Sequence, residues 1–166
     1  MNREDKILLE QNRKKFSLRS MYFNRYLLVR YMTALFFFTN LYWFLSLIFS
    51  NSSLYFVPLM QIIVLILCFA EQVKIYSKHT NHAKYTIYSF RFLVVINIVL
   101  LILACFPGSF HMLYPFLVNE LKSRIMIISL LTVGIILCLI TLNRLNKIKH
   151  DQDRYFQYIK EYEKLM

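Results

Sequence analysis

The chain has 166 residues, a formal net charge of +11 and a hydrophobic fraction of 58%. Soluble domains are about 45–50% apolar, so these values exclude an ordinary soluble domain. Only two Gly and three Pro residues are present, which argues against a β-rich fold with many turns. The positive charge would also suit nucleic-acid binding, but no nucleic-acid recognition module accompanies it, and we expect no nucleic acid as a partner.

Three stretches contain no Asp, Glu, Lys or Arg: residues 31–70, 92–119 and 125–143. A helix needs about 20 predominantly apolar residues to cross the roughly 30 Å hydrocarbon core of a membrane. The first stretch is long enough for two crossings, and the side chains of Ser50–Ser53 favour a turn between them. We therefore predict an all-α integral membrane protein in which four transmembrane helices form one bundle and one domain.

The predicted segments alternate spans with short connections. In chain order they are a basic amino-terminal segment (1–30), span 1 (31–49), span 2 (54–70), a connection (71–88), span 3 (89–106), an outer interfacial loop (107–124), span 4 (125–142) and a tail (143–166). Pro58 falls in the first turn of span 2, where a missing amide costs little. The sequence PGSF at Pro107–Phe110 is a turn signal that ends span 3.

The positions of Lys and Arg predict the orientation, because these side chains resist transfer across the membrane. Of the 20 Lys and Arg residues, only Lys122 and Arg124 fall on one side of the predicted spans, and the other 18 fall on the opposite side. We therefore expect both termini to be cytoplasmic and the chain to lie in a plasma (inner) membrane. A composition rich in Lys, Ile and Tyr indicates an AT-rich genome, as in low-GC bacteria.

The amino-terminal segment mixes cationic and aromatic side chains next to span 1. Basic side chains near a membrane gain about 1 kcal/mol each from anionic lipid head groups, and aromatic side chains favour the same interface. The segment therefore predicts contacts with membrane lipids through Arg13, Lys14, Lys15, Arg19, Arg25 and Arg30.

Apolar residues recur in the tail at intervals of three and four, which predicts an amphipathic helix with one apolar stripe. No Pro or Gly separates the tail from span 4, so we expect this helix to continue from span 4. Two interpretations remain open: the stripe packs on the cytoplasmic segments of its own chain, or it pairs with another chain. The stripe consists of Leu145, Ile148, Tyr155, Ile159 and Tyr162.

Each predicted span carries a polar residue near its middle, and we call these four residues the polar level: Asn40, Gln61, Asn97 and Thr132. A polar group in hydrocarbon is costly unless it is hydrogen-bonded, so each should face another helix. Hydrogen bonds between membrane helices contribute about 0.6 kcal/mol on average. The polar level therefore predicts either structural hydrogen bonding inside the bundle or the lining of a pore or ligand pocket.

Candidate residues for catalysis or metal binding are few. His79 and His82 lie one helical turn apart and are candidate metal ligands, although two ligands do not make a structural zinc site. Glu71 is the nearest carboxylate, and its neighbour Lys74 predicts an exposed ion pair at the interface. No known catalytic motif is present, no Asp or Glu lies inside a predicted span, and the three Cys residues fall in three different spans. We predict no catalytic residues and no cofactor.

These features favour a non-enzymatic membrane protein that acts through protein–protein contacts, as a regulator, a transporter accessory subunit or an immunity-type protein. Its expected partners are anionic membrane lipids and another membrane or cytoplasmic protein, with a homo-oligomer as a further option. One alternative is a homo-oligomeric channel or small transporter lined by the polar level. A second alternative is a membrane-embedded enzyme that modifies lipids, with His79, His82 and Glu71 at the cytoplasmic face.

Overall fold

The computed structural model describes residues 3–78 and 83–164, which form helices and turns without strands. The helices are α1 (Arg3–Arg25), α2 (Leu27–Phe49), the one-turn 3₁₀ helix η1 (Ser53–Tyr55), α3 (Phe56–Lys78), α4 (Lys84–Ala104), α5 (Pro107–Leu113), α6 (Leu121–Lys149) and α7 (Arg154–Lys164). In this part of the chain, four segments are long and apolar enough to cross a membrane, and they comprise α2, most of α3, α4 and α6. The predicted all-helical fold with four such helices is confirmed.

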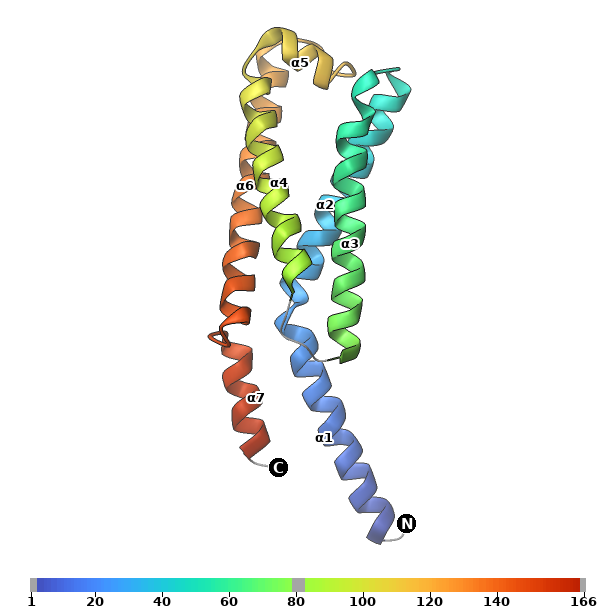
Figure 1. Cartoon of the computed structure of the whole chain (residues 1–166), viewed down its shortest axis with the longest axis vertical. Helices are drawn as coiled ribbons and strands as arrows, with labels where there is room; N and C mark the ends of the chain where they lie inside the picture. The colour runs from blue at the N-terminus through green and yellow to red at the C-terminus, as the bar shows by residue number, and fades with distance from the viewer. Residues whose placement is uncertain (1–2, 79–82, 165–166) are drawn as a thin grey trace.

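The four long helices pack into one bundle (Figure 1), in which α2 contacts α3, α3 contacts α4, and α6 contacts both α4 and α2. Each helix contributes buried apolar side chains to the largest core cluster, which includes Phe36, Leu65, Phe90 and Cys138. The Phe36 and Phe90 rings meet edge to face at 6.1 Å, an arrangement that aromatic pairs prefer. The outer faces of the same helices expose many large apolar side chains, as helices facing lipid do.

The predicted turn between the first two spans is present, and its geometry explains the choice of residues. Asn51 has a φ of 49°, in the left-handed region that Asn tolerates better than most residues. Its amide donates to the Ile48 carbonyl, and the Ser52 amide donates to the Leu47 carbonyl. This pair of hydrogen bonds is the Schellman motif, which satisfies carbonyl groups at the end of α2.

At the end of the bundle that carries α5, the connection between α4 and α6 folds over α2. Helix α4 ends at Ala104, just before the PGSF sequence, as predicted. The PGSF sequence itself is not a turn but begins α5, because proline is well suited to the first position of a helix. The Trp43 ring stacks on Tyr114 with centroids 5.6 Å apart, and its Nε1 donates to the Leu113 carbonyl at 3.3 Å. These contacts tie the connection to α2 and close this end of the bundle.

The opposite end, which we call the terminal end, carries α1 and α7, and both helices extend beyond the bundle (Figure 1). The prediction that the tail helix continues from span 4 is wrong. Helix α6 runs on to Lys149, but Asp151 has a φ of 53°, and a second Schellman motif breaks the helix before α7 begins at Arg154. Helix α7 then packs against α1.

Candidate functional site

The polar level does not form one set of facing side chains. Asn40, Gln61 and Asn97 are buried in the bundle. The amide nitrogen of Asn40 donates to the Phe36 carbonyl at 2.8 Å, and that of Asn97 donates to the Leu93 carbonyl at 2.9 Å. Both bonds stay within one helix and return to the preceding turn, so the two amide nitrogens donate to their own helices rather than to each other.

Thr132 departs from the prediction because it lies on the exposed face of α6, where its hydroxyl donates to the Ile128 carbonyl at 2.8 Å. Two residues further along α6, Gly134 faces the interior of the bundle. A Cβ added there would lie 3.8 Å from Phe36 Cε1 and 4.0 Å from Asn97 Oδ1. In the middle of the bundle, α6 therefore approaches α2 and α4 closely at this glycine.

A second set of buried polar side chains, which the sequence did not single out, joins three helices toward the terminal end. The amide nitrogen of Gln72 donates to Thr33 Oγ1 at 2.8 Å and contacts Cys68 Sγ at 3.2 Å. Cys68 Sγ in turn lies 3.6 Å from Thr86 Oγ1. We call these four residues the Thr33 network. None of the partners of Cys68 is a general base, so the network supports hydrogen bonding between helices rather than nucleophilic chemistry.

Glu71, at the end of span 2, caps the first turn of α4. Its carboxylate accepts from the backbone amides of Tyr85 at 3.0 Å and Thr86 at 2.6 Å, and from the Thr86 hydroxyl at 2.7 Å. The first amides of a helix lack partners within the helix and carry a partial positive charge. This geometry corrects the prediction of an exposed ion pair with Lys74 and makes Glu71 a structural residue that joins α3 to α4.

The candidate metal ligands His79 and His82 lie outside the described residues. Among residues that the structure describes, His, Cys, Asp and Glu form no group of three or more that could hold a metal ion. Neither finding tests whether the chain has a catalytic activity.

Arg25, the last residue of α1, is fully buried and reaches into the joint between α6 and α7. Its Nε donates to both carboxylate oxygens of Asp153, at 3.1 and 3.0 Å, and its Nη2 donates to Asp153 Oδ1 at 2.6 Å. Nη2 also donates to Asp151 Oδ1 at 2.6 Å and to the Ile148 carbonyl at 3.3 Å. We call Arg25, Asp151 and Asp153 the Arg25 clasp.

The Arg25 clasp overturns the prediction that Arg25 contacts lipid head groups, because this guanidinium is enclosed by its own chain. Burial by itself lowers the pKa of Arg25, but the hydrogen bonds and negative charges of Asp153 and Asp151 outweigh burial and raise the pKa above its usual value. The Phe156 ring of α7 lies 4.8 Å from the guanidinium carbon, in cation–π range. One arginine thus joins α1, the end of α6 and α7.

The other predicted lipid-contact residues have different surroundings. Arg13 and Lys14 are exposed on α1, and Arg30 stacks over the Phe23 ring at 3.9 Å. At 1.5 Å per residue, Arg13 lies about 18 Å along α1 from Arg25. The side chains of Lys15 and Arg19 are not described. Contacts of these residues with lipid head groups stay a prediction.

The predicted apolar stripe of the tail is divided between two helices. Leu145 and Ile148 are buried near the end of α6, and Ile159 is buried on α7. Tyr155 is half-exposed beneath the Arg144 guanidinium, and Tyr162 is half-buried. Because α7 packs on α1, part of this stripe is covered within the chain, as in the first of the two interpretations.

Comparison with known proteins finds no matching family model, no matching curated protein and no matching solved structure. The function therefore has to be argued from the geometry described above.

Proposed function

We propose that this chain is a non-enzymatic regulator or accessory subunit in a plasma membrane, with both termini cytoplasmic, which acts by contacting another protein. The observation that carries this proposal is the Arg25 clasp, because it fixes the position of two helices outside the spans. A buried ion pair contributes little net stability, and its attested use is to specify one arrangement over others. A defined pair of cytoplasmic helices is the element that a partner would recognise.

The free half of α1 supports the same proposal. Helix α1 extends beyond α7 (Figure 1), and its side chains Leu8, Leu9 and Phe16 are 57%, 47% and 74% exposed. Large apolar side chains that gather on a helix outside the membrane are typical of a protein interaction site. Exposed Arg13 and Lys14 lie between them in sequence, so the proposed partner surface is apolar with acidic groups at its edge.

The alternative of a homo-oligomeric channel has less support. The amides of Asn40 and Asn97 bond within their own helices, and Thr132 lies on a different face from them. A lining of this kind would not give a continuous row of polar groups to a permeating ion. The lipid-modifying enzyme depends on His79 and His82, whose arrangement is outside the described residues, and no observation favours it.

Site-specific photocrosslinking in the native membrane tests the proposed function. A photoreactive residue at Phe16 should capture a discrete protein, and the same residue at Phe38, an exposed position on α2, serves as a lipid-facing control. We expect Leu9→Ser with Phe16→Ser to abolish the specific association of the chain with that protein. The matched control is Asn12→Ser, an exposed polar position on the same helix. Equal association in both variants would refute the role of α1.

A further inference from the structure

A hollow of about 190 Å³ opens at the terminal end, between the first turns of α4 and the last turns of α6. Tyr26, at the junction of α1 and α2, forms part of its wall. Pockets for drug-sized ligands have volumes of about 300–1,000 Å³. This hollow is smaller, so it suits a single small polar group rather than a complete large ligand.

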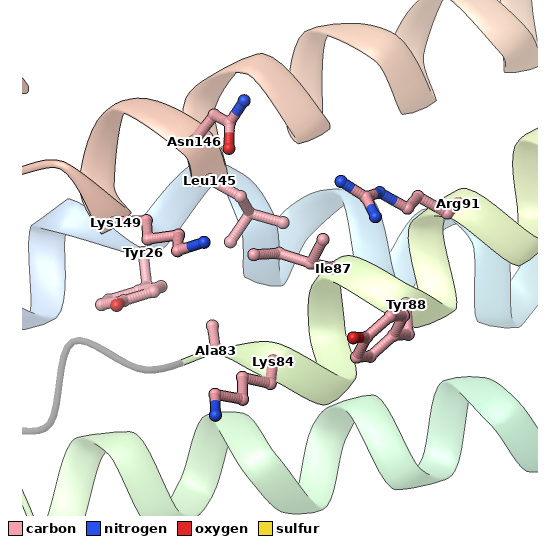
Figure 2. Close-up of a pocket in the computed structure, with 9 residues that line it drawn as sticks. All are labelled: Tyr26, Ala83, Lys84, Ile87, Tyr88, Arg91, Leu145, Asn146 and Lys149. Atoms are coloured by element: carbon pink, nitrogen blue, oxygen red, sulfur yellow. The ribbon is translucent and has the colours of Figure 1, made fainter.

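Three cationic side chains line the hollow, and no lining residue is acidic: Lys84, Arg91 and Lys149. Figure 2 shows the Arg91 guanidinium and the Lys149 ammonium extending toward the middle from opposite ends, while Lys84 points away in this view. None of these three residues forms an ion pair with another described residue. The chain therefore concentrates positive charge here without neutralising it.

The nearby carboxylates are engaged elsewhere. Glu71 accepts hydrogen bonds from the first amides of α4. Asp151 and Asp153 accept hydrogen bonds from Arg25. Positive charges that converge without a counter-ion favour the binding of an anion.

Tyr26 contributes its ring, not its hydroxyl, to the wall. The residue is only 4% exposed, and its hydroxyl is buried without a hydrogen-bond partner among the described residues. Burial raises the pKa of Tyr26 to about 12. Because the hydroxyl oxygen is enclosed, a ligand in the hollow would meet the cationic side chains rather than this group.

The position of the hollow indicates which kind of molecule supplies the anionic group. Arg91 is the last charged residue before the apolar stretch of α4, and the side chains of Ile87 and Leu145 lie between Arg91 and Lys149 (Figure 2). The hollow thus combines an apolar wall with cationic groups where α4 leaves the hydrocarbon. Basic pockets between membrane helices at this depth are typical sites for anionic lipid head groups.

We propose that this hollow binds the phosphate of an anionic phospholipid, with Arg91 and Lys149 as its cationic ligands. The guanidinium and the ammonium engage the phosphate oxygens from opposite sides, and an acyl chain follows the apolar wall toward the bilayer. This site goes beyond the proposed function, because it involves no protein partner and does not depend on one.

Lipid binding to the purified full-length chain in neutral detergent, measured by native mass spectrometry, tests the site. We expect phosphatidylglycerol to bind at least tenfold more tightly than phosphatidylcholine, whose quaternary ammonium a cationic hollow disfavours. Arg91→Gln with Lys149→Gln should weaken phosphatidylglycerol binding at least tenfold. The matched control, Arg13→Gln with Lys14→Gln, removes the same charge from α1 and should change it less than twofold. Equal losses in the two double variants would overturn the proposal.

Competition by inorganic phosphate distinguishes the two sources of the anion. If inorganic phosphate displaces the lipid at equal concentration, the occupant is a soluble phosphate and the lipid assignment is overturned.

Discussion

The guanidinium of Arg25 and the carboxylate of Asp153 share three hydrogen bonds, although 128 residues separate them in sequence. Both side chains are fully buried. Removing one member of such a pair leaves an uncompensated buried charge and costs about 3–5 kcal/mol, whereas replacing both members by apolar residues is often neutral. The pair therefore favours the one position of α7 in which both charges are paired.

Arg25→Met should release α7 from α1, because undocking α7 returns the unpaired Asp153 carboxylate to water. We expect amide hydrogen exchange in α7 to accelerate at least tenfold, with exchange in the four long helices unchanged. Adding Asp153→Leu to Arg25→Met should restore most of the protection, since no buried charge is then left without a partner. Protection of α7 that is unaffected by Arg25→Met would show that apolar contacts alone hold the tail.

The sequence predicts the four long helices because the absence of charge over some 20 residues is a strong local signal. The Arg25 clasp is different in kind, because it depends on how a chain end and a chain start meet in space. The six basic residues predicted to contact lipid all lie near the first span, and nothing in the adjacent sequence distinguishes Arg25, the one that is buried. The hint that the sequence offers is the acidic pair Asp151 and Asp153, which follows a basic stretch at the end of α6.

The polar level shows a second limit of sequence reasoning. Counting residues from the ends of a span fixes the depth of Thr132, but the side of the helix it faces depends on a rotation of about 100° per residue. Two residues further on, Gly134 has turned into the bundle while Thr132 faces outward. The sequence does not predict the break between α6 and α7, because the residue with left-handed backbone conformation is Asp151, whereas glycine is the usual residue at the end of a helix.

The turn between α2 and α3 requires Asn51 to adopt a left-handed backbone conformation. Its φ of 49° is costly for a β-branched side chain, so Asn51→Val should destabilise the protein by about 1–2 kcal/mol. Asn51→Gly should not destabilise it, because glycine reaches this region freely. Thermal unfolding in detergent compares the two variants. Equal Tm values would mean that the turn relaxes to accommodate valine.

Glu71→Ala removes the side chain that caps α4 and should destabilise the first turn of that helix. A lost helix cap costs about 0.5–2 kcal/mol, and here the loss should appear as faster hydrogen exchange at the amides of Tyr85 and Thr86. Lys74→Ala is the matched control, because the Glu71 carboxylate bonds to α4 whether or not a lysine is nearby. If Lys74→Ala has the same effect as Glu71→Ala, the ion pair expected from the sequence contributes to the cap after all.

Gly134 and Thr132 form a matched pair on α6, two residues apart at nearly the same depth. Gly134→Leu places a large side chain against Phe36 and Asn97, and we expect a loss of about 1–3 kcal/mol from overpacking. Gly134→Ala should be tolerated, since its Cβ would meet these residues at ordinary contact distances of 3.8 and 4.0 Å. Thr132→Leu should change the stability by less than about 0.5 kcal/mol, because the hydroxyl bonds only within its own helix on the exposed face.

The free energies of unfolding of these three variants, measured in one detergent, decide which face of α6 is structural. A loss in Thr132→Leu as large as that in Gly134→Leu would contradict the packing described here. It would mean that the outer face of α6 is covered in the assembled protein, as the homo-oligomeric alternative requires. If only Gly134→Leu is destabilised, the close approach of α6 to α2 and α4 is the contact that holds the middle of the bundle together.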